Sequence, residues 1–163
     1  MSGHPDSDVP CPLRLTVKQP HLWNGRADPY LYKAVVELRA GDAVRDTVEQ
    51  PLGLRFFKVD PEKGFFLNGK PYHLHGVNRH QDRWNTGWAL TEADQEEDID
   101  LIYELGCTVL RCAHYQHSDT IYSLCDKKGI LVWAELPQVD EIFAGPKYAE
   151  TSPAGSRTTP SSN

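Results

Sequence analysis

The sequence predicts an α/β protein in which antiparallel strands come first and parallel strands alternating with helices follow. Residues 13–60 show apolar and polar alternation with turn signals between the runs, as in antiparallel sheets. From residue 72 to residue 134, short apolar runs alternate with helix-like patterns. That order winds a parallel sheet or opens an eight-stranded barrel.

Composition and charge exclude several classes of protein. The 163 residues are 39% apolar and 25% charged, as in ordinary globular proteins, and a net charge of -6 argues against nucleic-acid binding through a basic patch. The first residues lack the basic and apolar regions of a signal peptide, and no apolar run is long enough to span a bilayer. The four cysteines form no CxxC pair. We therefore expect a reduced, cytoplasmic protein that binds neither nucleic acid nor membrane.

The antiparallel strands are expected to form part of a β-sandwich. Strands are expected at residues 13–18, 31–38, 43–49 and 54–59, with Gly41-Asp42 as the turn of a hairpin. Asn68-Gly69, between apolar arms, is a strong signal for a further hairpin. A boundary near Asp60 is predicted to separate a disordered N-terminus (1–12) and a partial sandwich (13–60) from a second domain (61–142).

The second domain begins with a strand predicted at residues 74–77, which leads into Asn78-Arg79-His80. A helix is expected to start after Thr91, with Asp94 completing a capping box, and to end at Gly106. The next apolar run, at residues 109–110, stops abruptly at polar side chains. Such side chains at the carboxyl ends of parallel strands are where α/β folds bind ligands.

A second helix and a third strand complete this pattern. Ser118 is expected to cap the helix at its start, and Gly129 supplies the left-handed residue that follows a helix. Residues 130–134 are continuously apolar, which is typical of a strand covered on both faces. Residues 143–163 have a disordered composition. Because a whole barrel takes about 250 residues, the residues after Lys70 are expected to supply only its opening.

Four stretches resemble glycoside hydrolase family 2, the β-galactosidase and β-glucuronidase type, in which an immunoglobulin-like β-sandwich precedes a catalytic TIM barrel. They are residues 20–32, 64–71, 75–80 and 109–133, and Val-Leu-Arg-Cys-Ala-His-Tyr at the start of the last stretch is similar to a family signature. Thr108 and Gln116 depart from the family pattern, which usually has Asn and Pro there. The resemblance implies an incomplete (β/α)8 barrel of about three strands after part of a sandwich.

The resemblance also implies a sugar site at the strand ends. Asn78, His80 and His114 would line a substrate-binding subsite, and Arg111 and Glu135 would support it. Sugar hydroxyls need convergent donors and acceptors, which these side chains supply. For Arg111 and Glu135, an ion pair that shapes the barrel is the stronger interpretation.

The activity implied by the resemblance is that of a retaining glycoside hydrolase, with a β-galactoside favoured over a β-glucuronide as the carbohydrate substrate. Retention needs two carboxylates about 5 Å apart. The resemblance puts the acid/base Glu beyond the fourth barrel strand and the nucleophile beyond the seventh, so neither is expected here. No catalytic residue, cofactor or metal is assigned, and the chain alone is expected to be an inactive, truncated part of a homo-oligomeric enzyme.

Two other interpretations remain open. A non-catalytic fragment could bind sugar or complement a partner chain, and its unpaired strand edges and apolar surface favour self-association. His73 and His75 alternate on a strand, as metal ligands do in amidohydrolase-like barrels, although no second ligand set is visible. Leu136 stands where the family's magnesium site would need a carboxylate. Three tryptophans suit either sugar stacking or packing: Trp84, Trp88 and Trp133.

Overall fold

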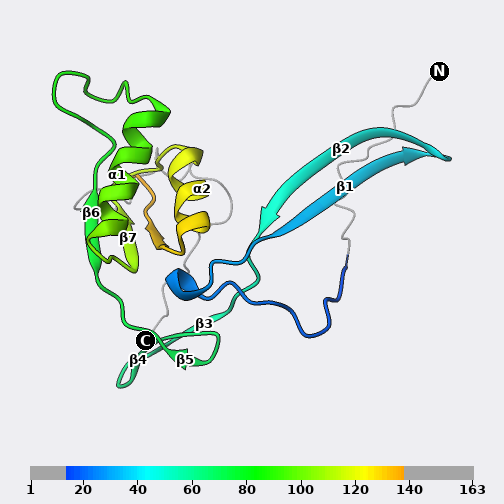
Figure 1. Ribbon diagram of the computed structural model, residues 1–163, viewed down its shortest axis with the longest axis horizontal. Helices are drawn as coiled ribbons and strands as arrows, with labels where there is room; N and C mark the ends of the chain where they lie inside the picture. The colour runs from blue at the N-terminus through cyan, green and yellow to red at the C-terminus, as the bar shows by residue number, and fades with distance from the viewer. Residues whose placement is uncertain (1–13, 138–163) are drawn as a thin grey trace, which may run out of the picture.

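The structure is a computed structural model that describes residues 14–137. Within that range the chain forms a two-stranded sheet, a three-stranded antiparallel sheet and a three-stranded parallel sheet flanked by two helices. In Figure 1 the first hairpin extends away from the helical part, and the small antiparallel sheet lies below it. The predicted α/β class, with antiparallel strands before parallel ones, is confirmed.

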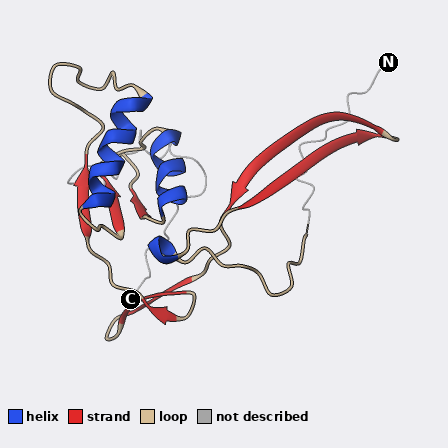
Figure 2. Ribbon diagram, in the orientation of Figure 1, coloured by secondary structure: helices blue, strands red, loops and turns tan. Residues whose placement is uncertain are grey.

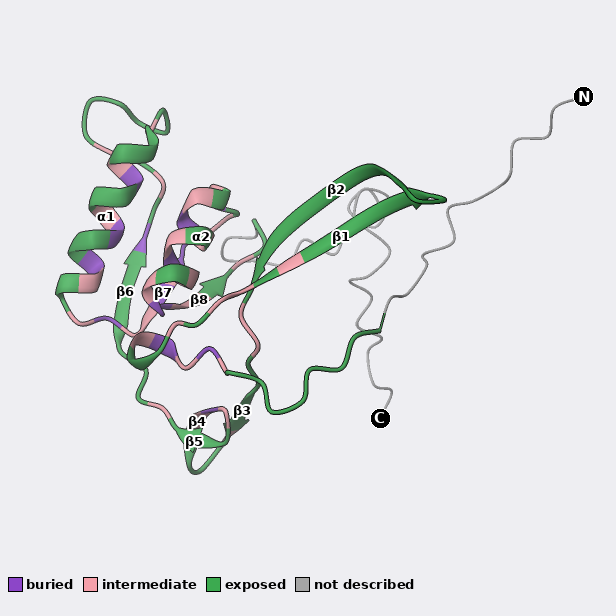
Figure 3. Cartoon of the chain, turned by 45° about the vertical axis from the view of Figure 1, so that its right-hand side comes forward, coloured by how far each residue is buried: buried purple, intermediate pink, exposed green. Residues whose placement is uncertain are grey.

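The first sheet is a long hairpin of β1 (Tyr32–Ala40) and β2 (Ala43–Leu52). Gly41 has a φ of 60°, so the predicted turn uses the left-handed backbone that glycine allows. Almost every residue of the hairpin is exposed, as Figure 3 shows. The strand predicted at residues 13–18 is wrong for the described residues 14–18, and Leu15 is 90% exposed. Alternating sequence alone does not make a strand where no neighbouring strand supplies hydrogen bonds.

The second sheet contains β3 (Phe57–Asp60), β4 (Gly64–Leu67) and β5 (Lys70–Pro71) in the order β3-β4-β5. Asn68 and Gly69, which join β4 to β5, have φ values of 51° and 79°. Two successive positive φ angles are what a type I′ hairpin turn requires, so the predicted hairpin is confirmed. The domain boundary near Asp60 stays a prediction.

The third sheet is parallel and consists of β6 (Gly76–Arg79), β7 (Val109–Cys112) and β8 (Leu131–Ala134). Helices α1 (Glu92–Glu104) and α2 (Asp119–Lys128) connect these strands and lie against the same face of the sheet (Figure 2). The strand predicted at residues 74–77 is in fact β6, two residues further on. The reason is that the Thr108 hydroxyl donates to His73 O (2.8 Å) and accepts from His75 N (3.0 Å).

Both helices begin and end largely as the sequence predicts. Thr91 and Asp94 form the reciprocal capping box at the start of α1. Gly129 follows α2 with a φ of 75°. Ser118 does occupy the N-cap position of α2, but its side chain makes no capping bond and instead donates to Gln95 on α1. The Ser118 hydroxyl therefore binds the buried side-chain amide of Gln95 and does not cap α2.

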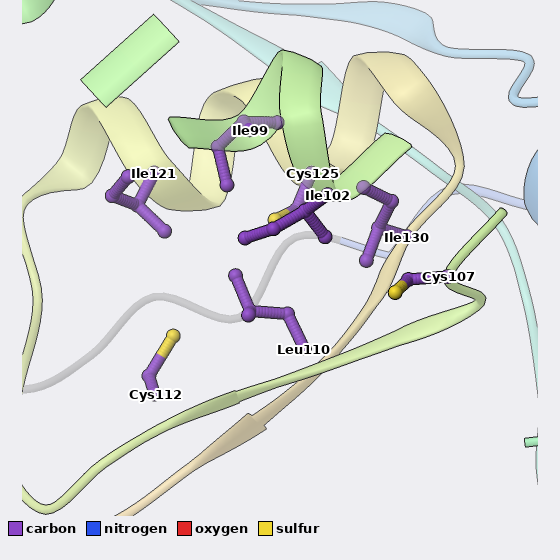
Figure 4. Packing of buried hydrophobic residues seen from close by; sticks show 8 residues of the cluster. All are labelled: Ile99, Ile102, Cys107, Leu110, Cys112, Ile121, Cys125 and Ile130. Carbon is purple, nitrogen blue, oxygen red and sulfur yellow. The ribbon is translucent and has the colours of Figure 1, made fainter. Parts of the chain in front are cut away.

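The core lies between the two helices and the parallel sheet (Figure 4), and eight buried residues make it up: Ile99, Ile102, Cys107, Leu110, Cys112, Ile121, Cys125 and Ile130. The three cysteines in this core are free thiols that pack as small apolar residues. The expectation that β8 is covered on both faces is wrong within residues 14–137, because Trp133 is 63% exposed. Among the described residues, helices cover one face of the sheet only, and β8 lies at its edge.

The segment before β1 is docked on the ends of the helices. Trp23 is fully buried and its indole Nε1 donates to Asp126 O at 2.8 Å. Arg26, in the short 3-10 helix η1 (Gly25–Ala27), donates to Tyr103 O (2.8 Å) and Cys107 O (3.1 Å). These bonds satisfy carbonyls at the end of α1 and just after it, and they tie the N-terminal part of the chain to the parallel sheet.

Within residues 14–137 there is no helix that is long and apolar enough to cross a membrane. The cytoplasmic location stays a prediction.

Candidate functional site

The parallel register brings the predicted site residues together at one edge of the sheet. Asn78 in β6 lies beside Arg111 in β7, and Arg111 lies beside Trp133 in β8. Glu135 follows β8 directly, and His114 is two residues beyond the end of β7. Because parallel strands end at a common edge, side chains far apart in sequence meet there.

Glu135 is the centre of a four-residue polar array. Its Oε1 accepts from Arg111 Nε at 2.6 Å, and its Oε2 lies 3.0 Å from His114 Nδ1. Arg111 also donates from Nη1 to Asn78 Oδ1 at 3.4 Å. The predicted ion pair is present, but it is partly open, with Arg111 37% exposed and Glu135 18% exposed.

The array selects one tautomer of His114. Arg111 Nη2 also lies 3.2 Å from His114 Nδ1, and both contacts cannot be hydrogen bonds at once. A proton on Nδ1 would donate to the Glu135 carboxylate, which is the charged and nearer partner. That tautomer leaves Nε2 of the neutral ring as a hydrogen-bond acceptor.

The charge on Glu135 is stabilised in this position. The hydrogen bond from Arg111 holds the pKa of Glu135 below its usual value, and His114 acts in the same direction, while burial opposes both. Glu135 is therefore an ionised carboxylate at neutral pH. It organises its neighbours and is a poor proton donor.

His80 joins the array through aromatic contacts. Its ring meets the His114 ring edge-on, with centroids 5.2 Å apart, and lies 6.2 Å from the Tyr115 ring. The Trp88 indole stacks on the Tyr115 ring, with centroids 4.8 Å apart and an interplanar angle of 29°. All five predicted residues thus lie in or against one cluster at the strand ends, and their roles in binding stay predictions.

A buried network behind the site was not predicted from the sequence. Arg79 is 6% exposed and contacts Asp98 Oδ2 of α1 through Nε (3.0 Å) and Nη2 (2.8 Å). Its Nη1 lies 3.2 Å from Nδ1 of the buried His117, whose Nε2 is 3.2 Å from Ala113 O. The sequence shows an acidic run at the start of α1, but nothing in the sequence tells which carboxylate faces an arginine.

The loop between β6 and α1 is held by Arg83. Its guanidinium donates to carboxylates on three residues of α1, each at 2.8 Å: Asp94, Glu97 and Asp98. Hydrogen bonds to Asp98 and Glu97 raise the pKa of Arg83 above its already high value. The loop that carries Trp84 and Trp88 is thereby attached to a rigid element.

The two departures from the family pattern make hydrogen bonds, and the possible metal ligands His73 and His75 lie near each other. Thr108 links the residues before β6 to β7, and Gln116 Oε1 accepts from Tyr122 at 3.3 Å. The His73 and His75 rings lie 5.6 Å apart. Across residues 14–137, no three His, Cys, Asp or Glu side chains gather to hold a metal ion.

Comparisons with known proteins identify the family of the chain. Residues 57–158 match the family described as "Glycosyl hydrolases family 2, TIM barrel domain", and residues 2–55 match "Glycosyl hydrolases family 2". A β-glucuronidase of Bacteroides fragilis is 46% identical over 86% of this chain and 19% of its own length. A β-galactosidase of Bacteroides ovatus is 36% identical over 75% of this chain and 14% of its own.

Solved structures show the same relationship. Bacteroides uniformis β-glucuronidase 2, covalently bound to cyclophellitol-6-carboxylate aziridine, is 37% identical with a TM-score of 0.74, over 82% of this chain and 16% of that one. The chain therefore spans less than a fifth of the length of these relatives. The relatives include both β-glucuronidases and β-galactosidases, so they do not support the galactoside over the glucuronide. The matches cover the antiparallel part and the parallel part in turn, and the chain belongs to glycosyl hydrolase family 2.

Proposed function

We propose that the strand ends of β6, β7 and β8 form part of the subsite for the terminal sugar of a β-glycoside, in a retaining glycosidase. The observation that carries this proposal is the array of Asn78, Arg111, His114 and Glu135 at the carboxyl edge of the parallel sheet. Retaining glycosidases place their substrate at such an edge and fix its hydroxyls by hydrogen bonds.

Each side chain in the array has a separate part in the proposal. Glu135 orients the His114 ring, so that Nε2 can accept from a sugar hydroxyl. Asn78 and His80 are exposed and offer further donors and acceptors beside it. Arg111 holds both Asn78 and Glu135 and thus keeps the hydrogen-bonding groups at set distances before the sugar arrives.

A neutral terminal sugar suits these residues better than a uronate. The two guanidinium groups at the strand ends are already ion-paired, Arg79 with Asp98 and Arg111 with Glu135. A sugar carboxylate would lie near the negative charge of Glu135, and the described side chains of the array include no unpaired cation to offset that repulsion. We therefore propose a β-galactoside. The β-glucuronide is the second candidate, because the B. fragilis relative at 46% identity is named a β-glucuronidase.

Histidine NMR tests the subsite directly. Long-range ¹H–¹⁵N spectra of the 163-residue chain would be recorded with methyl β-D-galactopyranoside and with methyl β-D-glucuronide. The galactoside is expected to shift His80 and His114 but not His21, which pairs with Asp28 in the N-terminal segment. His114→Ala should remove the response, whereas His75→Ala, before β6, should keep it. A stronger response to the glucuronide would reverse the sugar preference, and no response to either glycoside would contradict the subsite.

The expectation that the 163-residue chain alone hydrolyses no glycoside is tested separately. We expect no release of p-nitrophenol above background from p-nitrophenyl β-D-galactoside or β-D-glucuronide. Turnover that disappears in His114→Ala would show that this chain carries catalytic groups of its own.

A further inference from the structure

Aromatic rings form a continuous track that leads away from the polar array. The track consists of His114, His80, Tyr115 and Trp88, with successive centroid distances of 5.2, 6.2 and 4.8 Å. It starts at the proposed sugar subsite and ends on the loop after β6. The proposed function uses only its first two members.

Trp88 has one face packed and the other open. Its indole stacks on Tyr115, yet the residue is 67% exposed. Tyr115 is itself attached to the start of the loop, because its hydroxyl accepts from Gln81 N at 3.0 Å. The apolar ring is thus held by a stacking contact on one face while its other face is open to solvent, where a ligand can pack on it.

The loop around Trp88 is braced and ordered. Arg83 N donates to Gly87 O (3.0 Å) and Gly87 N donates to Arg83 O (2.9 Å), which closes a tight turn just before Trp88. Leu90 N then donates to Trp88 O at 2.9 Å. Because the Arg83 side chain also binds α1, the loop is ordered before a ligand arrives, which lowers the entropic cost of binding at Trp88.

From these observations we propose that Trp88 is the stacking platform for a second pyranose ring, the one on the leaving-group side of the glycosidic bond. The inference rests on the proposed function, since it takes the terminal sugar to lie on Asn78, His80 and His114. A sugar ring has an apolar C–H face that packs on an aromatic ring, and binding sites join such apolar walls to a few polar groups. The substrate class is therefore a disaccharide or longer β-linked chain.

Trp84 provides a matched control on the same loop. It is 88% exposed and lies inside the turn of Arg83–Gly87, four residues before Trp88. No aromatic ring of residues 14–137 stacks on it. The proposal assigns sugar stacking to Trp88 and gives Trp84 no part in it.

Indole ¹H–¹⁵N resonances of the 163-residue chain test the proposal. The chain would be titrated with methyl β-D-galactopyranoside and with lactose, or with methyl β-D-glucuronide and a glucuronyl-β-1,4-glucose if the histidines prefer the uronate. Both sugars should shift His80 and His114, whereas only the disaccharide should shift the Trp88 indole. The buried Trp23 indole, bonded to Asp126 O, serves as the unshifted reference and as a check of folding.

Variants give the decisive comparison. The disaccharide is expected to bind about two- to twelvefold more tightly than the monosaccharide, as one aromatic stacking contact allows. Trp88→Ala should abolish that difference, Trp88→Phe should keep part of it, and Trp84→Ala should keep all of it. The proposal is overturned if the histidines respond but Trp88 does not, or if Trp88→Ala weakens both sugars equally. If no glycoside shifts the histidines, the proposed function fails and this inference fails with it.

Discussion

The buried ring of His117 connects the core to the polar array. Its Nδ1 faces the Arg79 guanidinium, which can only donate, so Nδ1 carries no proton and Nε2–H donates to Ala113 O. Ala113 immediately precedes His114. The chain from Asp98 through Arg79 and His117 therefore holds the backbone from which His114 projects.

Two replacements of His117 measure how much its hydrogen bonds contribute to stability. His117→Ala should destabilise the chain by about 1–3 kcal/mol at pH 7, because Arg79 Nη1 and Ala113 O each lose a partner in a buried place. His117→Gln can accept from Arg79 and donate to Ala113, so it should cost clearly less. Urea unfolding followed by circular dichroism measures both. Equal losses for the two variants would show that ring packing, and not hydrogen bonding, sets the contribution of His117.

The same side chain predicts a pH dependence. Burial lowers the pKa of His117 from 6.5, and the nearby Arg79 and His80 charges act in the same direction, although the bond to Ala113 opposes them. As the pH falls below about 6.5, the unfolded chain takes up a proton there and the folded chain does not, so stability should decline. The decline should be smaller in His117→Gln. An unchanged pH profile in that variant would assign the effect to other groups.

At the scale of elements, local chemistry predicted more than periodicity did. The Asn68-Gly69 turn, the Thr91 and Asp94 capping box and Gly129 are where the sequence puts them, because each depends on a few adjacent residues. The start of β6 and the absence of a strand at residues 14–18 depend on partners remote in sequence. Thr108, whose hydroxyl binds the backbone before β6, lies more than thirty residues further along the chain.

Gly129 shows how one position can serve both a helix end and a tertiary contact. Its φ of 75° is left-handed, and a Cβ added there would clash with the Gly25 carbonyl of the docked N-terminal segment. Gly129→Ala should therefore cost more than the roughly 1–2 kcal/mol of left-handed backbone strain. It should also release Trp23, whose indole N–H would exchange faster with solvent.

Gly106→Ala is the matched control for Gly129→Ala. Gly106 also follows a helix with a φ of 78°, but an added Cβ would meet only His75 Nε2 at 3.8 Å, an ordinary contact. Thermal unfolding, followed by the circular dichroism signal of the helices, should show that Gly106→Ala is less stable than the wild type and more stable than Gly129→Ala. If the two variants are equally destabilised, the contact between Gly25 and Gly129 contributes nothing measurable.

At the scale of the whole molecule, the site could be assembled from the sequence only through resemblance and strand order. Asn78, Arg111 and Glu135 each stand at a strand end, and parallel pairing alone makes them neighbours. The network of Arg79, Asp98 and His117 could not be foreseen, because side-chain pairing between a strand end and a helix leaves no periodic signal. The ring track that ends at Trp88 likewise depends on the loop conformation, which the sequence does not show.

The exposed apolar surface leads to a prediction about association. Val36 and Val48 face each other across the β1–β2 hairpin and are 51% and 48% exposed, and Phe57 on β3 is 68% exposed. Contiguous apolar surface and open strand edges favour contacts between chains. We expect the sedimentation coefficient of the 163-residue chain to rise with concentration in the micromolar range.

Charged substitutions locate the surface responsible. The double variant Val36→Lys and Val48→Lys places two like charges opposite each other on the hairpin, which disfavours the docking of a second chain there. The hydrophobic core should be little affected, because it contains no residue of the hairpin. Sedimentation of this variant should no longer depend on concentration. Leu101→Lys, a comparable change on the exposed side of α1, should associate as the wild type does. If the wild-type chain sediments as a monomer at all concentrations, the prediction of self-association is wrong for this chain.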